Sequence, residues 1–238
     1  MNSKILFTMD IDWTSEDVIH SALSFFKERQ IPCLLFQTHF SETIEKEKSS
    51  LFSRELHPNF CENSEHGEEV GDVFRAIEYL DHLGVCVRAH KYFMPDEALE
   101  YIKSAGYLFT LNNYTNLSYR KPFKICEGVI ELNTFFEDGF YLKNNYPFDV
   151  NFVTEKIKKK GIYVFNIHPI HLAFNAREYA LTRQFKDTLS RYQYRNINQL
   201  FINKYMNKEY GIRNFITDLV QKLKSLDCHF ISINEVDV

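Results

Sequence analysis

The sequence predicts an α/β fold in which parallel strands alternate with helices, most simply a distorted (β/α)7-type barrel. Short apolar runs recur along the chain, and the segments between them have helical spacing, which is the order expected for parallel strands joined by helices. The chain has 238 residues, of which 45% are hydrophobic, and this length and composition suit one barrel around one core. We therefore expect a single domain over residues 1–238.

In the first half of the chain, four apolar runs predict strands at residues 4–9, 32–37, 85–89 and 107–111. Helices are predicted at 14–29, 42–52, 68–83 and 95–105, with a short segment at 54–60 and a polar loop at 61–67. Ser15 is a favourable N-cap for the first helix, while Pro95 begins the fourth and Gly106 follows it. The alternation of strand and helix predicts parallel pairing.

In the second half, residues 112–145 are rich in aromatic residues and Asn, and their apolar runs at 129–133 and 135–142 predict β-structure. A helix at 150–160, a strand at 162–167, a helix at 214–226 and a strand at 229–233 complete about seven strand-helix units. Residues 173–210 contain no Gly or Pro and are predicted to be an excursion from the barrel.

Composition excludes several classes of protein. The formal net charge is −4 and the basic residues are dispersed, so we expect no nucleic-acid partner. No apolar stretch reaches the length of roughly 20 residues that spans a bilayer, and the first apolar run is too short for a signal peptide. Five cysteines without CxxC spacing argue against a disulfide framework, so a cytoplasmic protein is predicted.

Two carboxylates, Asp10 and Asp12, follow the first strand, at the end where parallel α/β folds place functional groups. Alternate strand residues point to the same side, so both can face one cavity, where two close carboxylates repel unless a cation or proton lies between them. The alternative is that they cap the helix that begins near Thr14.

Several histidines are candidate ligands or acids. His57 precedes Pro58, which rigidifies the turn, and His66 lies in the polar loop; either is an ordinary structural histidine when taken alone. His168 follows the strand at 162–167, where a histidine can protonate a leaving group, although a histidine satisfied by the backbone would also fit there.

Two further segments place polar side chains at the same rim. Arg88 and His90 end the predicted strand at 85–89 on one face, which is costly in a core unless they are paired. Asp138 lies in an Asp-Gly sequence that turn chemistry alone would explain.

Taken in order, these segments resemble the polysaccharide deacetylases of the NodB-homology type, carbohydrate esterase family four, and more narrowly a divergent branch of lipopolysaccharide and surface-polysaccharide biosynthesis proteins. The segments that carry the resemblance are Phe7-Thr8-Met9-Asp10-Ile11-Asp12, Glu55-Leu56-His57-Pro58-Asn59-Phe60, Ser64-Glu65-His66-Gly67, Val87-Arg88-Ala89-His90, Phe165-Asn166-Ile167-His168-Pro169 and, more weakly, Phe136-Glu137-Asp138. The resemblance covers roughly residues 1–175 and the closing helix and strand, and it implies the NodB-homology barrel.

The resemblance also implies roles for these residues. Asp10 matches the general base, Arg88 the residue that positions it, and His168 the general acid, with Asp138 as its carboxylate partner. Asp12 and His57 match metal ligands. The family's second motif has two histidines four residues apart, but Cys61 stands four residues after His57. His66 is therefore the preferred third ligand, with His90 and Cys61 as alternatives, and His90 is otherwise a catalytic candidate where a proline is usual.

The implied function is metal-dependent hydrolysis of an N-acetyl or O-acetyl group on a sugar or glycan precursor. Zn²⁺ suits imidazole and carboxylate ligands, and Co²⁺ or Ni²⁺ would also be accepted. One alternative is a C–N hydrolase that acts on a small amide in the same fold. Another is a noncatalytic carbohydrate-binding or scaffold protein on a degenerate barrel, since fold alone does not fix function.

Overall fold

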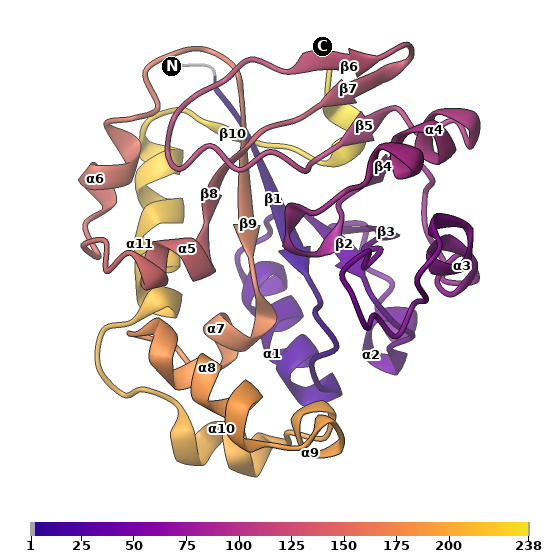
Figure 1. Cartoon of the computed structure of the whole chain (residues 1–238). Coiled ribbons are helices and arrows are strands. Elements are labelled where there is room, and N and C mark those ends of the chain that lie inside the picture. The colour runs from indigo at the N-terminus through magenta and orange to yellow at the C-terminus, as the bar shows by residue number, and fades with distance from the viewer. Residues whose placement is uncertain (1–2, 238) are drawn as a thin grey trace.

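The computed structural model describes residues 3–237 and contains a ten-stranded sheet. The strands follow the order β6-β7-β5-β4-β3-β2-β1-β9-β8, and β10 pairs with β1 (Figure 1). Their bounds are β1 Lys4–Asp10, β2 Cys33–Gln37, β3 Phe52–Leu56, β4 Cys86–Val87, β5 Phe109–Thr110, β6 Phe123–Cys126, β7 Val129–Glu131, β8 Thr134–Glu137, β9 Ile162–Ile167 and β10 His229–Phe230. Only the pairing of β6 with β7 is antiparallel among the described strands. The predicted α/β fold with parallel strands is confirmed.

The closure of the sheet is incomplete. β6 and β8 end the paired order, and no ladder joins them within residues 3–237. A single parallel bridge between Tyr114 and Thr134 nevertheless connects the segment after β5 to β8. The strands therefore form an incompletely closed barrel, because no continuous ladder of hydrogen bonds runs around it among the described residues.

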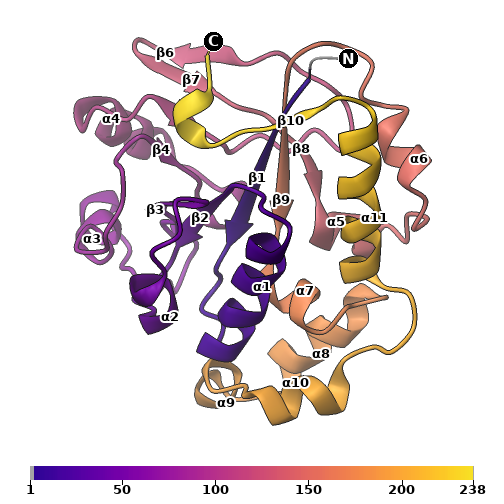
Figure 2. The same cartoon turned by 180° about the vertical axis from the view of Figure 1, so that it is seen from behind.

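Helices surround the sheet. They are α1 Glu16–Glu28, α2 Glu42–Lys46, α3 Val70–Arg75, η1 His90–Tyr92, α4 Asp96–Ser104, α5 Asp138–Lys143, α6 Val150–Thr154, α7 Pro169–Ala173, α8 Tyr179–Thr188, α9 Arg191–Arg195, α10 Gln199–Tyr205, α11 Ile212–Ser225 and η2 Ile233–Glu235. Figure 2 shows α1 and α11 against the outer face of the central strands, where Phe26 and Phe215 join the main buried cluster. None of the helices described is long and apolar enough to cross a membrane.

The alternation of side chains along β1 explains why the strand ends in a buried polar residue on its inner face. Phe7 and Met9 belong to the cluster packed by the outer helices, whereas Leu6 belongs to a second cluster on the opposite face of the strand. Thr8 and Asp10 continue the Leu6 face, because alternate strand residues point to the same side. The inner face of β1 thus changes from apolar to polar toward its carboxyl end.

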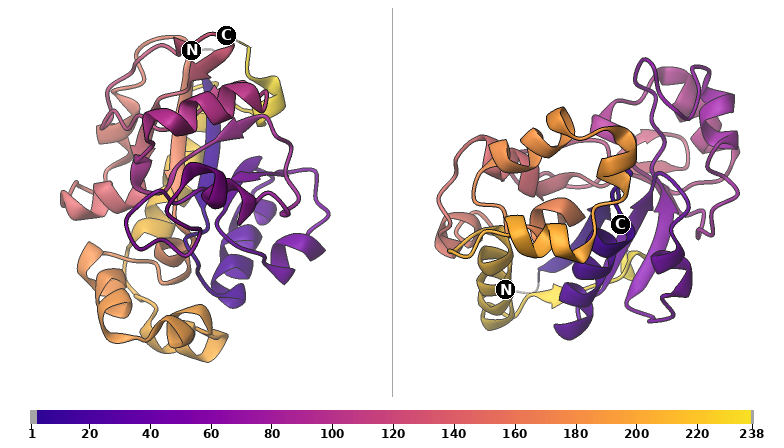
Figure 3. Two further views of the ribbon diagram at one scale, coloured as in Figure 1. Left: turned by 45° about the vertical axis from the view of Figure 1, so that its right-hand side comes forward. Right: turned by 90° about the horizontal axis from the view of Figure 1, so that it is seen from below.

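The helices α7, α8, α9 and α10, here called the cover helices, lie at the carboxyl ends of β1 and β9 (Figure 3). They enclose a separate apolar cluster in which Phe174 and Phe185 pack near Val18 of α1. They contain most of the predicted excursion at 173–210, which is helical. The assignment of residues 1–238 to one domain stays a prediction.

Some predicted elements were wrong in extent. The helix expected at 42–52 ends at Lys46, because Phe52 already pairs with Cys33 as the first residue of β3. The β-run expected at 135–142 becomes helix α5 at Asp138, because the Glu137 side chain accepts a hydrogen bond from the Phe140 N–H and caps the helix. The helices expected at 68–83 and 150–160 are also shorter, at Val70–Arg75 and Val150–Thr154.

Candidate metal centre and active site

The predicted functional residues lie together at the carboxyl edge of the parallel strands. Asp10 ends β1, His57 follows β3, Arg88 follows β4 and His168 follows β9. A cavity of about 250 Å³ opens above them and is lined by Asp10 and His168 among others, with α5 and α8 forming part of its wall. Parallel strands place their carboxyl ends at one edge, so residues from distant parts of the sequence meet there.

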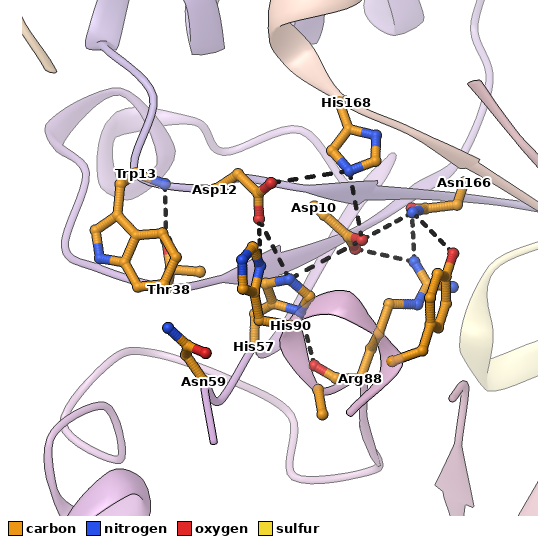
Figure 4. Close-up of polar contacts among 12 residues, drawn as sticks. Asp10, Asp12, Trp13, Thr38, His57, Asn59, Arg88, His90, Asn166 and His168 are labelled. Atoms are coloured by element: carbon orange, nitrogen blue, oxygen red, sulfur yellow. Dashed lines mark hydrogen bonds and ion pairs between the residues drawn. The ribbon is translucent and has the colours of Figure 1, made fainter. Parts of the chain in front are cut away.

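Asp10 is held by a buried polar network. Arg88 Nη1 donates to Asp10 Oδ1 at 3.0 Å, and Asn166 Nδ2 donates to Asp10 Oδ2 at 2.7 Å (Figure 4). The predicted contact between Arg88 and Asp10 is therefore present. The Arg88 side chain is fully buried and also donates to the Leu111 carbonyl and to Thr134 Oγ1. A planar guanidinium with five donors satisfies these acceptors in one geometry, which a lysine could not do.

The Asp12 carboxylate faces the ring nitrogens of two histidines. His57 Nε2 lies 3.4 Å and His90 Nδ1 lies 3.0 Å from Asp12 Oδ1 (Figure 4). These contacts lack hydrogen-bond geometry, and Asp12 Oδ1 is a buried oxygen with no hydrogen-bond partner among the described residues. One ligand atom from each of the three residues lies within 4.8 Å of the others. An orphaned carboxylate oxygen beside two imidazole nitrogens fits a divalent cation.

The hydrogen bond on the far side of the His57 ring fixes which nitrogen faces the cavity. His57 Nδ1 lies 2.7 Å from the Arg88 carbonyl oxygen. Because a carbonyl can only accept, Nδ1 carries the proton and Nε2 presents its lone pair toward Asp12. A ligating histidine ordinarily donates its other N–H in this way.

His66 is placed differently from the sequence hypothesis. Its Nε2 donates to the Thr38 carbonyl at 2.8 Å, and its Nδ1 accepts from the Asn59 N–H at 3.1 Å. Both ring nitrogens are therefore used to fasten the loop after β3 to the end of β2. The structure does not bring His66 into the group with Asp12 and His57, nor does it bring Cys61, whereas it brings His90 there.

Backbone strain coincides with the candidate ligands. Asp12 and Trp13 have φ values of 48° and 54°, and Lys91 and Tyr92, directly after His90, have values of 56° and 58°. Non-glycine residues in this left-handed region each cost about 1–3 kcal/mol, and such strain is concentrated at functional sites. The Trp13 ring also packs against His90, with ring centroids 5.3 Å apart.

His168 and Asp138 form the second half of the site. His168 Nδ1 lies 2.7 Å from Asp138 Oδ1, and the His168 N–H donates to Asp138 Oδ2. The predicted partnership is therefore present as a contact. His168 Nε2 faces the carboxylates, 4.0 Å from Asp10 Oδ2 and 3.9 Å from Asp12 Oδ2.

Burial and charge set the protonation of these groups. Burial raises the pKa of Asp10, but Arg88 and the histidines outweigh this effect and hold the pKa below its ordinary value. Burial likewise opposes ionisation of Asp12, while His90 and Lys186 hold its pKa well below the usual range. Burial lowers the pKa of His168, but the Asp138 carboxylate outweighs it and raises the pKa to about 10.

Three residues of the site were not predicted. Asn166 could have been suspected, because it is an amide inside the apolar strand β9 and a buried amide needs partners. Glu137 lies 3.2 Å from His168 Nδ1, and burial raises its pKa to about 7. Lys186 of α8 lies 3.6 Å from Asp12 Oδ2, and no local sequence signal connected this exposed helix position with a site. His171 Nδ1 also lies near this group, 3.0 Å from Asp138 Oδ2.

Comparisons with known proteins address the family and the fold of this chain. The family model described as WbmS-like polysaccharide deacetylase matches residues 7–186. A crystal structure from Bordetella bronchiseptica, assigned as a polysaccharide deacetylase involved in O-antigen biosynthesis, is similar with a TM-score of 0.78 and 21% identity, over 92% of this chain and 90% of that one. A Mycobacterium smegmatis protein assigned as a polysaccharide deacetylase is similar with a TM-score of 0.60 and 11% identity, over 98% and 88% of the two chains.

No curated protein matches the sequence. The two structural likenesses support the NodB-type fold, and the family model covers most of the chain. The chain belongs to the WbmS-like polysaccharide deacetylase family.

Proposed function

We propose that this protein is a divalent-metal-dependent deacetylase that removes an N-acetyl or O-acetyl group from a sugar in surface-polysaccharide biosynthesis. The observation that carries the proposal is the buried Asp12 Oδ1, which has no hydrogen-bond donor in the described part of the chain and faces the nitrogens of His57 and His90. The setting is extended from the B. bronchiseptica relative, which is described as involved in O-antigen biosynthesis.

We assign Asp12, His57 and His90 as the ligands. One carboxylate and two imidazoles leave open coordination positions, and the set suits Zn²⁺, with Co²⁺ or Ni²⁺ accepted as well. Such a cation would polarise the acetyl carbonyl and lower the pKa of the attacking water.

The remaining residues supply proton transfer. Asp10 is ionised and accepts the proton of the attacking water, and Arg88 and Asn166 keep its carboxylate in place. His168 is protonated at neutral pH and donates to the departing sugar nitrogen or oxygen through Nε2, while Asp138 holds Nδ1. The acyl C–N or C–O bond breaks, and acetate and the free sugar amine or alcohol are the products.

The test combines metal analysis with acetate release from acetylated glycans. Asp12→Asn should remove both bound metal and turnover, because an amide oxygen is a weaker ligand for zinc than a carboxylate. Asp227→Asn is the matched control, since Asp227 is exposed and has a similar φ of 56°. Full metal content in Asp12→Asn would refute the site.

A second variant distinguishes the proposed general acid, His168, from the proposed metal ligands. His168→Ala should keep the metal and lose turnover by about 10²- to 10⁴-fold, the usual contribution of a general acid. Unchanged turnover would refute the acid role. A metal-free wild-type protein without turnover would favour the noncatalytic alternative, and turnover limited to small amides would favour the C–N hydrolase.

A further inference from the structure

The mouth of the active-site cavity is rich in cations although the protein is acidic overall. Four of the sixteen residues that line the cavity are Lys or Arg, whereas these types make up 28 of 238 residues in a chain of net charge −4. The four are Lys91, Lys143, Arg183 and Lys186, which come from η1, α5 and α8. Three separate elements thus bring positive charge to one opening.

Two of these cations have no partner among the residues that the structure describes. Arg183 forms an ion pair with Asp187, and Lys186 lies beside Asp12. Lys91 and Lys143 are exposed and have neither an ion pair nor a side-chain hydrogen bond with any residue in the range 3–237. Their charges are therefore available to a bound anion.

The acids of the same cavity do not neutralise the two lysines. Asp10 is held by Arg88, and Asp12 belongs to the proposed metal centre. Glu137 is turned to the start of α5, where it accepts the Phe140 N–H. The three carboxylates that line the cavity are thus engaged with other groups of the protein, whereas, within the described chain, Lys91 and Lys143 at its mouth are not.

An aromatic stack joins the segments that carry the two lysines. The Tyr92 ring stacks on Tyr114 at 6.2 Å between centroids, and Tyr114 stacks on Phe140 at 4.6 Å. Lys91 directly precedes Tyr92, and Lys143 lies three residues after Phe140 on the same helix, where side chains share a face. The partly exposed Phe140 ring lines the cavity and offers a surface for a sugar ring.

A second pocket beside the site is also lined by basic residues, but its arginines are paired with a carboxylate. It has a volume of about 260 Å³ and also contains two arginines, Arg191 and Arg195. Both arginines form ion pairs with Glu65. Unpaired positive charge is therefore found on the α5 side of the metal centre.

We propose that the acetylated substrate carries an anionic group, a phosphate or a carboxylate, which Lys91 and Lys143 bind at the mouth of the cavity while the sugar lies against Phe140. Lysine ammonium groups bind phosphate and carboxylate oxygens through charge-assisted hydrogen bonds. The inference rests on the proposed function for the identity of the ligand as an acetylated sugar.

The test uses three acetylated probes: neutral chitopentaose, phosphate-bearing UDP-N-acetylglucosamine and a carboxylate-bearing hyaluronan tetrasaccharide. Binding is measured by calorimetry with the metal-loaded Asp10→Asn variant, and acetate release is measured with the otherwise unchanged enzyme. A Lys91→Met/Lys143→Met double substitution removes the two charges in each background. Lys158→Met, on the exposed segment before β9, is the matched control.

At least one anionic probe should bind about tenfold more tightly than chitopentaose, and the one that does identifies the phosphate or carboxylate source. The double substitution should weaken that probe about tenfold, or about threefold for each lysine, which is within the range for partly exposed ion pairs. Binding of chitopentaose and binding by the Lys158→Met protein should be unaffected. The preference should shrink at high salt, because exposed charges are screened.

The proposal is overturned if chitopentaose binds as tightly as both anionic probes, or if both anionic probes fail to bind at millimolar concentration. It is also overturned if the double substitution leaves anionic binding unchanged or weakens all probes equally. Absence of acetate release from every probe, with anionic preference in binding intact, would instead refute the deacetylase function and leave the anion site standing.

Discussion

The third ligand of the proposed metal centre can be decided by comparing His90→Gln with His66→Gln. His90 Nδ1 lies 3.0 Å from the orphaned Asp12 Oδ1, whereas both nitrogens of His66 are engaged by the Thr38 carbonyl and the Asn59 N–H. Each substitution replaces an imidazole by a polar side chain of similar reach. The geometry therefore predicts opposite effects of the two changes on metal affinity and on stability.

The expected magnitudes follow from the contacts. Structural zinc sites with four ligands bind with roughly 10–16 kcal/mol, so loss of one ligand should cost about 3 kcal/mol, or about a hundredfold in affinity. His90→Gln should show this loss. His66→Gln should keep the metal but lose about 1–3 kcal/mol of stability, because its two neutral hydrogen bonds are weakened and a buried carbonyl loses its donor.

The assay is competition for Zn²⁺ with a chelator of known affinity, together with urea unfolding of each metal-free protein. Cys61→Ser is the third arm and should leave metal affinity unchanged, since Cys61 is not among the grouped ligands. Loss of metal in His66→Gln with retention in His90→Gln would refute the assignment and restore the hypothesis made from the sequence.

Three further outcomes follow from the buried charges. Asp138→Asn removes the carboxylate that raises the pKa of His168, so the alkaline limb of kcat/KM, where the acid is lost, should move about 1–3 pH units lower; an unmoved limb would contradict the pairing. Arg88→Lys leaves the Leu111 carbonyl and Thr134 Oγ1 without donors and should cost about 2–4 kcal/mol in urea unfolding, while wild-type stability would contradict the network. Burial raises the pKa of Glu55 in the folded protein to about 7, although three backbone N–H groups that donate to its carboxylate oppose this shift. The contribution of Glu55 to stability is therefore greatest below pH 4.5 and declines by roughly 3 kcal/mol as pH rises to 7. Glu55→Gln should remove that decline, and an equal slope in both proteins would contradict it.

The parallel strands could be predicted because their signals are local. Ile162–Ile167 and Lys4–Asp10 are mostly apolar and rich in β-prone residues, and they pair with each other over six registered positions. The helix boundaries could not be predicted where tertiary pairing decides them. Phe52 fits a helical pattern in the sequence, but its pairing with Cys33 places it in a strand.

The site was predictable as far as it depends on strand ends. Asp10, Arg88 and His168 follow strands whose position was evident, and the parallel order brings them together. The choice between His66 and His90 depends on which ring nitrogens are occupied, and this is set by Thr38 and Asn59 across a loop. Spacing along the chain contains no information about those contacts.

The different roles proposed for Asp10 and Asp12 follow from the different partners of their carboxylates. Both oxygens of Asp10 accept hydrogen bonds, from Arg88 and Asn166, and these contacts hold its carboxylate ionised and oriented. Asp12 Oδ1 has no hydrogen-bond donor within residues 3–237, so its lone pairs are available to a cation. Because their surroundings differ, Asp10 is suited to accept a proton and Asp12 is suited to bind a cation.

The lowered pKa of Asp10 also constrains the reaction. A weakly basic carboxylate accepts a proton readily only from a water whose own pKa has been lowered. Bulk water is too weak an acid for Asp10, whereas water beside a divalent cation has a pKa near 7 in the best zinc sites. The base role proposed for Asp10 and the ligand role proposed for Asp12 therefore depend on each other, and a cation-free protein should lack turnover even with Asp10, Arg88 and His168 intact.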